Sequence, residues 1–348
     1  MTFALQVVIN AVSIGSLYAL AALGIGLLFG VMRLINFAHA NYITIGAYAI
    51  IVPSTAAMAT LYIGTWHWAL MTAAVCLIVV VLAALTEFVV FRPLRHADPV
   101  TMLVGSFALS FSLYYILLLT YGGRPKAVDI GRGLTEQIAF AGLTIPKIDI
   151  VTIAVSLALL AALGLFLKKS RWGIQMRAAS EDFRMARLLG VRANAVISIA
   201  FAISGLLAAA VSLLYLSRVG VLFPRMGLPL VIIAFVATVI GGMGSLLGAA
   251  LGGFLVGAVS VVLQTVLPLE FRAHRDAIVY LLVIAVLLWR PGGLIRSSRP
   301  GNASRWPSCS APSGGRGRRC RCRCCWWRRS RWCGPSATGA SNGPPSRR

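Results

Sequence analysis

One charged segment of this chain lies between long apolar runs. Residues 170 to 196, SRWGIQMRAASEDFRMARLLGVRANAV, hold five arginines, one glutamate and one aspartate. The order of residue types predicts a helix of about nine residues, which is too short to be stable alone in water. Ser180 is a suitable N-cap, and Gly190 suits the left-handed position that follows a helix C-terminus. We therefore expect this helix to pack against another surface.

The charges of this predicted helix follow its dipole. Glu181 and Asp182 lie in the first turn, and Arg184 and Arg187 lie toward the other end. An apolar stripe runs along the helix and consists of Phe183, Ala186 and Leu189, with Met185 and Leu188 alongside. Two interpretations stay open: the helix rests on the bilayer or on its own bundle, or it docks a cytoplasmic partner. Acidic residues favour the partner, because faces that bind lipid are usually basic without acids.

Three polar side chains interrupt the second apolar run of the chain. Asn36, His39 and Asn41 stand near its start. Polar groups inside a membrane need partners and usually face protein or a water-filled path. These residues are therefore candidates for the lining of a transport pathway, with His39 as a ligand or a proton carrier. The alternative is that His39 donates one hydrogen bond to a neighbouring carbonyl group and does no chemistry.

Residue types suited to catalysis or metal binding are sparse. Cys76 is the only cysteine before residue 309, so the body of the chain has no metal-ligand spacing. Glu87 precedes Arg92 and Arg95 closely enough to favour a structural ion pair over a transport carboxylate. The chain also lacks a Gly-x-x-x-x-Gly-Lys-[Ser/Thr] loop, so it cannot hold ATP phosphates in that way. We expect no enzyme activity, catalytic residue, metal site or bound cofactor.

The composition indicates a polytopic membrane protein of the all-α class. The chain is 59% hydrophobic and 12% charged, whereas a soluble domain has roughly 25% charged residues. A helix of about 20 apolar residues crosses the hydrocarbon layer of about 30 Å. We predict a helical bundle of eight spans, or nine, with a short cytoplasmic helix. The predicted spans are 4–30, 38–62, 67–90, 99–121, 149–168, 194–217, the region 228–267, and 276–290.

Basic residues predict how the spans are oriented. The segments 168–192 and 91–98, together with Arg33, are basic, and an even number of spans separates them. All three are therefore expected in the cytoplasm, which places the N-terminus and residues 122–148 outside. The region 228–267 fits either two passes or one pass with a re-entrant segment, broken at GGMG (241–244). Before the last span, Arg275 or Asp276 must be paired or lie at an interface.

Small residues recur at helical spacing in the same region. Gly244, Gly248 and Gly252 are four residues apart, and Gly253 and Gly257 are offset by one. Such a strip lets a second helix approach closely. The simpler interpretation is helix packing within one subunit, and the alternative is contact between subunits.

Several stretches together resemble the permease subunits of ABC importers for branched-chain amino acids, of the LivH type. They are FGVMRLINFAHANYITIGAY (29–48), EFVVFRPLR (87–95), RAASEDFRMARLLGVRANAVISIAFAISGLLAAAVSLLY (177–215), GGMGSLLGAALGGFLVG (241–257) and LLWRPGGLI (287–295). The resemblance covers nearly all of residues 1–295. Arg184 stands where the wider importer pattern has a glutamate, and Ala40–Asn41 stands where the family commonly has glycine followed by an acid.

The resemblance implies a function and an assembly. The helix at 180–190 would be the coupling helix that sits in a groove of an ATP-binding subunit. Two ATP-binding subunits, a second related permease and a solute-binding protein would complete the importer in the bacterial cytoplasmic (inner) membrane. The cargo would be leucine, isoleucine and valine, with ATP bound by the partner subunits. Alternatives are another small polar cargo, such as urea, amides, aromatic acids or a sugar, and a carrier or channel that works without ATP.

The last 53 residues differ in composition from the rest. Residues 296–348 hold 13 arginines and no acidic residue, so residues 1–295 keep a net charge of +10 out of +23. We divide the chain into a transmembrane permease domain, 1–295, and a disordered tail, 296–348, whose composition is typical of a frameshift product. Alternatives are a metal site in CRCRCC and the binding of nucleic acid or lipid headgroups by WWRRSRW. We expect membrane lipid as a partner and no nucleic acid.

Overall fold

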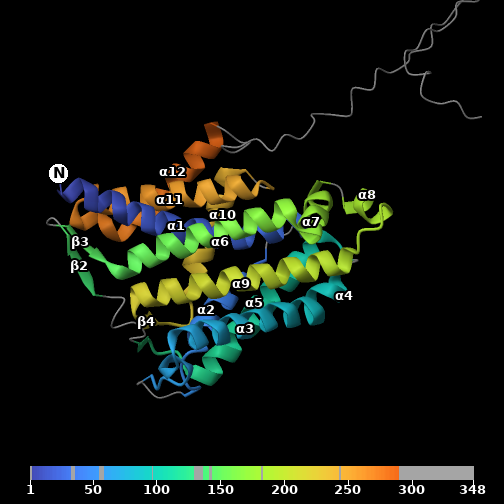
Figure 1. Ribbon diagram of the computed structural model, residues 1–348, viewed down its shortest axis with the longest axis horizontal. Helices are drawn as coiled ribbons and strands as arrows, with labels where there is room; N and C mark the ends of the chain where they lie inside the picture. The colour runs from blue at the N-terminus through green and yellow to red at the C-terminus, as the bar shows by residue number, and fades with distance from the viewer. Residues whose placement is uncertain are drawn as a thin grey trace, which may run out of the picture. The chain divides into compact units, whose positions relative to one another are not determined.

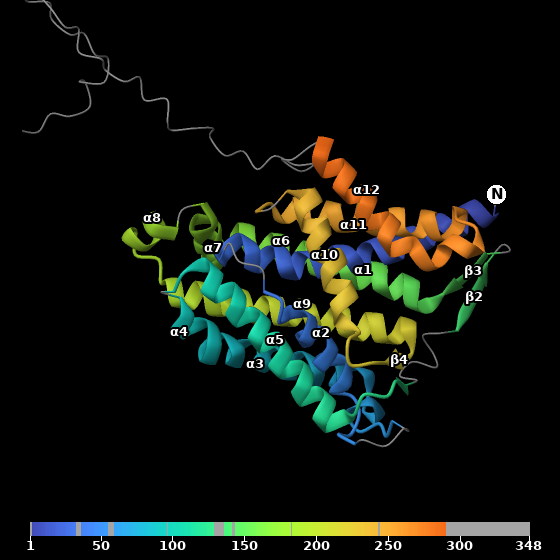
Figure 2. The same ribbon diagram turned by 180° about the vertical axis from the view of Figure 1, so that it is seen from behind.

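Long apolar helices form almost the whole of the computed structural model, which describes residues 2–32, 36–54, 59–95, 97–128, 136–140, 143–181, 183–242 and 244–289. Six of the described helices are long and apolar enough to cross a membrane. They are α1 (Thr2–Met32), α3 (Trp68–Thr86) with its continuation to Leu94, α5 (Pro99–Tyr121), α6 (Lys147–Lys169), α9 (Ala193–Val219) and α11 (Leu246–Val266). The predicted all-α bundle is confirmed (Figures 1 and 2).

The predicted count of eight or nine spans is not confirmed. Three further apolar helices in the described ranges are shorter: α2 (His39–Tyr48), α10 (Gly227–Gly241) and α12 (Arg275–Trp289). Some of the predictions fall outside the described residues. These concern Arg33, Asp182, and the tail with its predicted boundary at residue 296.

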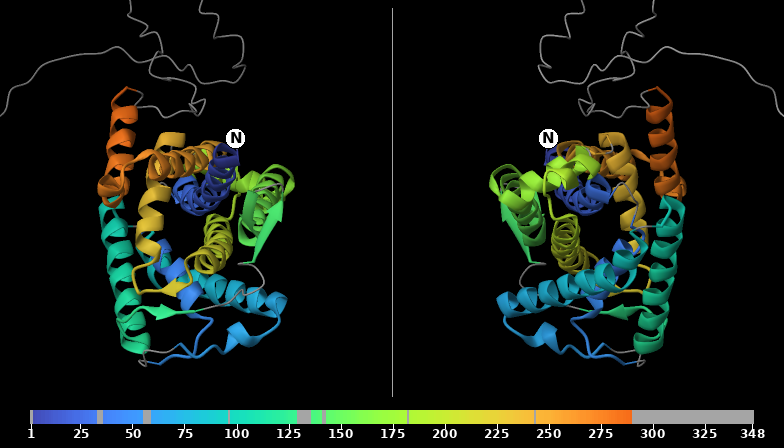
Figure 3. Two further views of the ribbon diagram at one scale, coloured as in Figure 1. Left: turned by 90° about the vertical axis from the view of Figure 1, so that its left-hand side faces the viewer. Right: turned by 90° about the vertical axis from the view of Figure 1, so that its right-hand side faces the viewer.

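The helix α1 lies at the centre of the bundle. It packs against α6, α9, α10 and α11, and the end-on views show it enclosed by them, with α3 and α5 farther out (Figure 3). The outer helices α3 and α5 expose large apolar side chains such as Leu77, Val81, Phe111 and Leu119. Exposed apolar faces on helices of this length suit contact with lipid, so the bundle has a protein core and a lipid-facing periphery.

The two ends of the bundle differ in structure. One end, the hairpin end, carries the N-terminus and two short antiparallel strand pairs: β1 (Lys126–Ala127) with β4 (Val221–Leu222), and β2 (Gln137–Phe140) with β3 (Leu143–Pro146). The other, the basic end, carries α4 (Arg92–Leu94), α7 (Arg171–Glu181) and α8 (Phe183–Leu188) (Figure 1). The segments 91–98 and 168–192 thus share one end, as their charge predicted.

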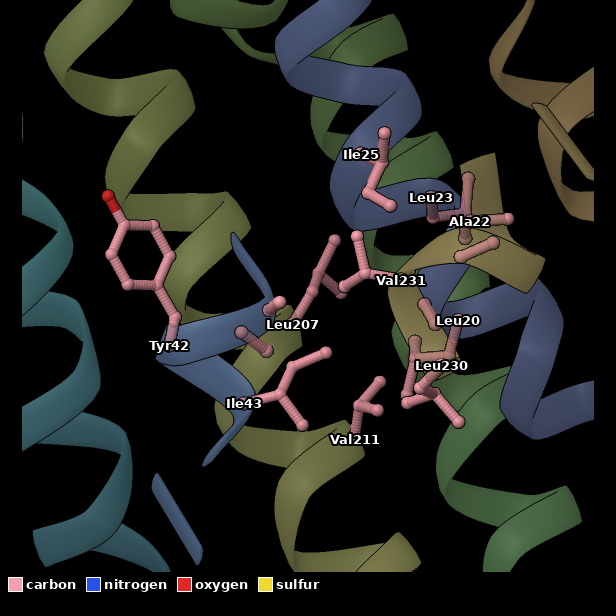
Figure 4. Close-up of a cluster of buried hydrophobic side chains, with 14 of the residues drawn as sticks. Leu20, Ala22, Leu23, Ile25, Tyr42, Ile43, Leu207, Val211, Leu230 and Val231 are labelled. Carbon is pink, nitrogen blue, oxygen red and sulfur yellow. The ribbon is translucent and has the colours of Figure 1, made fainter. Parts of the chain in front are cut away.

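The prediction of a continuous span over 38–62 is wrong. The helix α2 ends at Tyr48, and the chain then turns back through a bridge between Ile51 and Leu61 and a 3₁₀ turn, η1 (Ile63–Thr65). Pro53 opposes a continuous helix through the rest of the predicted span, because proline cannot donate to a helix and disfavours helical backbone in the residue before it. The helix α2 is therefore a short helix enclosed by the bundle. Figure 4 shows its Ile43 facing Val211 and Leu230.

The region 228–267 forms two helices, α10 and α11, with a break at the predicted glycines. Gly242 and Gly244 have φ of +103° and +100°, in the range that favours glycine. Ser245 then caps α11, since its Oγ accepts a hydrogen bond from the Gly248 amide at 3.1 Å. With 15 residues, α10 is about 22 Å long, shorter than the hydrocarbon layer.

The glycines of α11 bring three helices into backbone contact. A Cβ at Gly252 would collide with the Ala237 carbonyl oxygen of α10, and a Cβ at Gly253 would lie 2.5 Å from the Ala19 Cα of α1. Gly248 likewise faces the backbone of Gly241. Gly244 differs from the prediction, because it lies in the turn, where an added Cβ would meet nothing within 4 Å. The small-residue strip thus makes contacts within this subunit.

One buried ion pair joins helices near the hairpin end. Asp149, only 1% exposed, accepts hydrogen bonds from Arg218 Nη1 at 2.6 Å and from Ser13 Oγ at 2.8 Å, which links α6, α9 and α1. At the start of α12, Arg275 pairs with Asp276 at 2.8 Å. The sequence predicted that one of these two residues would be paired or would lie at an interface. Neither Asp149 nor Arg218 stood out in the sequence, because each lies at the edge of an apolar run.

Replacing Gly253 by alanine tests the close contact between α1 and α11. The new Cβ must displace the α1 backbone, and overpacking of this kind costs about 1–3 kcal/mol. Gly253→Ala should therefore lower the thermal unfolding midpoint of the purified protein in detergent. Gly30→Ala is the matched control, because an added Cβ there would meet nothing within 4 Å. Equal unfolding midpoints for the two variants would contradict the role of this contact.

Candidate functional site

A sharp corner between α6 and α7 sets the position of the charged segment. The chain turns at Ser170, and Gly173 then packs against the last turn of α6. A Cβ at Gly173 would lie 2.5 Å from the Leu167 Cα and would overlap the Phe166 carbonyl oxygen. The corner therefore requires glycine there, and it directs α7 across the basic end toward α1 and α9.

The charged segment forms two helices, so the prediction of one helix capped by Ser180 is wrong. Ser180 lies in the last turn of α7, where its Oγ donates a hydrogen bond to the Arg177 carbonyl oxygen at 2.7 Å. Glu181 is the last residue of α7 and is exposed. Arg184 and Arg187 belong to the second helix, α8. The missed signal is the corner at Gly173, which starts a helix upstream of Ser180.

The helix α8 ends where the sequence predicted, with Gly190 in the left-handed position after its C-terminus. Gly190 has φ of +87°, and its amide donates to the Arg187 carbonyl oxygen at 3.1 Å. The Val191 amide donates to the Ala186 carbonyl oxygen at the same distance. This pair of hydrogen bonds is a Schellman motif, which fixes the end of α8 to the start of α9.

The helix α8 presents apolar side chains at the basic end. Ala186 is buried, whereas Leu188 and Leu189 are 82% and 85% exposed. Arg187 and Gly190 are exposed beside them. The helix stands at the far end of the bundle, next to α7 (Figures 1 and 2). Exposed apolar residues mixed with charge are typical of a surface that binds another protein.

The three polar candidates of the second run lie at or just before the start of α2, and all are buried. Asn36 Oδ1 accepts a hydrogen bond from the Ala38 amide at 3.0 Å, which closes a turn just before the helix. Asn41 Nδ2 donates to Ser110 of α5, to its carbonyl oxygen at 2.9 Å and to its Oγ at 2.7 Å. Asn36 and His39 make no such hydrogen bond to Ser110, so the three side chains have different partners.

His39 is held by α1 and α9. The Ser204 hydroxyl donates to the Gly24 carbonyl oxygen at 3.1 Å and lies 3.2 Å from His39 Nδ1. Because the hydroxyl hydrogen is used, Nδ1 is the donor toward Ser204, and Nε2 is left as an acceptor. Neither Nε2 of His39 nor Nδ2 of Asn36 has a hydrogen-bond partner among the described residues.

A second polar cluster lies where α3, α4 and α9 meet near the basic end. Glu87 is 3% exposed and pairs with Arg95, as the sequence suggested. Ser198 Oγ donates to Glu87 Oε2 at 2.8 Å, and Arg95 also donates to Asn194 Oδ1. Glu87 begins η2 (Glu87–Phe91), a π-helical turn; such turns are frequent at functional sites. Sequence spacing indicated the ion pair but not its partners on α9.

This cluster continues to α2 through one hydroxyl pair. Thr86 Oγ1 donates to the Ala83 carbonyl oxygen at 2.9 Å and lies 2.6 Å from Tyr42 Oη, so Tyr42 is the donor between the two hydroxyls. Both side chains are buried, and Figure 4 shows Tyr42 extending away from the aliphatic cluster around Ile43. A polar connection thus runs from the start of α9, next to α8, to α2.

Among the residues that the structure describes, no group of three or more His, Cys, Asp or Glu side chains could hold a metal ion.

Comparison with known proteins identifies the family. The family model described as "Branched-chain amino acid transport system / permease component" matches residues 7–287. The high-affinity branched-chain amino acid transport system permease protein BraD of Pseudomonas aeruginosa is 32% identical over 297 residues, which cover 84% of this chain and 95% of that protein. LivH of Escherichia coli K12, a permease of the same description, has the same identity and coverage.

A more distant relative carries another cargo. The autoinducer 2 import system permease protein LsrC of Shigella flexneri is 29% identical over 187 residues, 52% of this chain and 53% of that protein. No solved structure matches the chain. The match over most of the chain, together with the apolar helical bundle, shows that this protein belongs to the family of branched-chain amino acid transport permeases.

Proposed function

We propose that this chain is the transmembrane permease of a bacterial ABC importer for leucine, isoleucine and valine. ATP bound by two partner subunits drives the transport, and a second related permease and a solute-binding protein complete the assembly. The observation that carries this proposal is α8, whose exposed leucines and arginine are held at the basic end by a Schellman motif. The identity to BraD and LivH supports the choice of cargo.

The charge of the basic end supports its orientation in the cytoplasmic membrane. Basic segments flank α4, α7 and α8, and short cytoplasmic loops are enriched in lysine and arginine. In this orientation α8 faces the ATP-binding subunits, and the strand pairs face the solute-binding protein. The polar atoms of Asn36 and His39 without described partners support a place for the start of α2 in the pathway, because buried polar groups are normally hydrogen-bonded to protein, water or a ligand.

The polar cluster at Glu87 supplies a route from α8 to the pathway. Displacement of α8 moves the start of α9, where Asn194 and Ser198 hold Arg95 and Glu87. Glu87 follows Thr86, which holds Tyr42 of α2. A buried ion pair resists separation, because either charge alone would be left unpaired in a low-dielectric site. Glu87 and Arg95 therefore act as positioning residues that transmit movement to α2.

Uptake of labelled leucine tests the cargo. A strain that lacks this gene should regain leucine uptake with the full-length gene, and also with a copy that ends at Ile295. Isoleucine and valine should compete. If the protein is inserted in the membrane but leucine uptake stays absent, the cargo assignment is wrong, and the same strain is tested with urea, amides, aromatic acids and sugars. The relation to an autoinducer 2 permease is the reason for testing other cargoes.

Substitutions in α8 test the docking of the ATP-binding subunit. Leu188→Asp places a charge in an apolar contact, and Arg187→Glu reverses a charge beside it. Loss of a central interface contact costs about 2 kcal/mol or more, equivalent to a loss in affinity of about 30-fold. Both variants should lose uptake and co-purification of the ATPase while they remain in the membrane. Leu188→Met is the control and should retain both. Normal uptake by the two charged variants would refute docking through α8.

The proposed route from α8 through Glu87 to α2 predicts that substitutions along it change the transport ratio, which is the number of leucine molecules moved per ATP hydrolysed. In vesicles with the complete importer, Glu87→Gln should lower the leucine moved per ATP hydrolysed by about tenfold, since a lost interaction of about 1.4 kcal/mol is worth a factor of about ten. Tyr42→Phe, a milder change, should lower the ratio several-fold. Asp149→Asn is the matched control, because it weakens a buried ion pair at the hairpin end and should keep the ratio. An unchanged ratio in Tyr42→Phe and Glu87→Gln would show that the route carries no coupling.

A further inference from the structure

An arginine lies among the transmembrane helices with its charge unpaired by any described carboxylate. Arg225 precedes α10 and is exposed in the isolated chain. Its guanidinium lies over the ring of Tyr114, 5.0 Å from the ring centroid. None of the ion pairs between described residues includes it. An arginine at membrane depth faces a partner, a binding site or water, because exposure of its charge to hydrocarbon is costly.

The position of Tyr114 gives the depth of this charge. Tyr114 is seven residues before the end of α5 at Tyr121, so the guanidinium lies about 10 Å below the hairpin end of that helix. The cation–π contact holds the group at this depth. Arg225 therefore keeps its charge beside Tyr114, about two helical turns before the end of α5.

One face of α5 joins Arg225 to the candidate pathway. Phe107, Ser110 and Tyr114 are spaced three and four residues apart, so they share a face of that helix. Along it, Phe107 stacks on Phe37 with ring centroids 4.0 Å apart, Ser110 accepts from Asn41, and Tyr114 carries Arg225. The arginine thus lies one helical turn from Asn41, toward the hairpin end, and continues the same row.

Two helix starts meet beside this row. The Gly227 amide, at the start of α10, donates to Thr44 Oγ1 of α2 at 3.1 Å, and a Cβ at Gly227 would overlap the Ala40 carbonyl oxygen. The first turns of α2 and α10 therefore lie together, and the positive ends of both helix dipoles favour an anion nearby. Asn36 adds a buried Nδ2 donor without a partner among the described residues at the start of α2.

We propose that Arg225 binds the carboxylate of the transported amino acid in the part of the pathway nearer the hairpin end. This inference rests on the proposed function and adds to it the group that recognises the cargo. A guanidinium binds a carboxylate through two parallel hydrogen bonds, which a single amine or amide cannot reproduce. The site selects the carboxylate and leaves the aliphatic side chain free, so leucine, isoleucine and valine all satisfy it.

Direct binding of leucine to the purified complex without its solute-binding protein tests this site. Arg225→Gln should weaken binding of labelled leucine at least tenfold, and Arg225→Lys should weaken it less. Leucinamide, which lacks the carboxylate, should bind the wild-type protein much more weakly than leucine does. In Arg225→Gln, leucine and leucinamide should bind with similar affinity, because the group that distinguishes them is gone. Arg275→Gln is the matched control, because Arg275 is paired with Asp276, and it should bind leucine like the wild type.

Each outcome bears on one claim. Leucine binding by Arg225→Gln equal to that of the wild type overturns the inference and leaves the proposed function intact. If added phospholipid, and not leucine, raises the thermal stability of the wild type but not of Arg225→Gln, the arginine binds a lipid phosphate, which also overturns the inference. A wild-type importer that moves no leucine in the uptake assay overturns the proposed cargo, on which this inference rests. Tyr114→Leu, which removes only the ring under Arg225, gives a second variant and should weaken leucine binding several-fold.

Discussion

The close approach of α1 and α11 is the constraint on which the bundle depends. Gly253 and Gly257 lie against the backbone of Ala19 and Gly15, and α10 reaches the opposite side of α11 through Gly248 and Gly252. Apolar side chains gain little by moving from lipid to protein, so association of membrane helices relies on such close packing. With α1, α10 and α11 fixed in this way, the remaining helices have a rigid core to pack against.

Interrupted helices are tolerated only inside such a core. Both α2 and α10 begin within the bundle, and their backbone groups must be satisfied where no water is available. Asn36 supplies an acceptor at the start of α2, and Thr44 supplies one at the start of α10. The same arrangement that satisfies the backbone also gathers polar side chains and helix dipoles at one place. The proposed binding site therefore uses the same residues that satisfy the ends of these two helices.

The sequence predicted the features that depend on local order. Uncharged runs located the long helices, GGMG located the break before α11, and Gly190 marked the end of α8. It did not predict that 38–62 would stop at Tyr48, because a buried half-length helix and a full span have the same apolar composition. Ser180 was misplaced for a similar reason, since the corner at Gly173 depends on contact with α6 and not on capping preference.

Contacts between distant segments lie beyond such reasoning. The spacing of Glu87 and Arg95 indicated an ion pair, but its partners Asn194 and Ser198 are about a hundred residues away in the chain. Arg225 gave no signal in the sequence, because only its contact with Tyr114 reveals its depth. Hydrogen bonds from Asn194 and Ser198 to the Glu87–Arg95 pair hold α9 near its start, and the ion pair between Arg218 and Asp149 holds it near its end. Between them, α2 is held by hydrogen bonds to α3, α5, α9 and α10 through polar side chains, so in the proposed route changes at the start of α9 reach it through Thr86 and Tyr42.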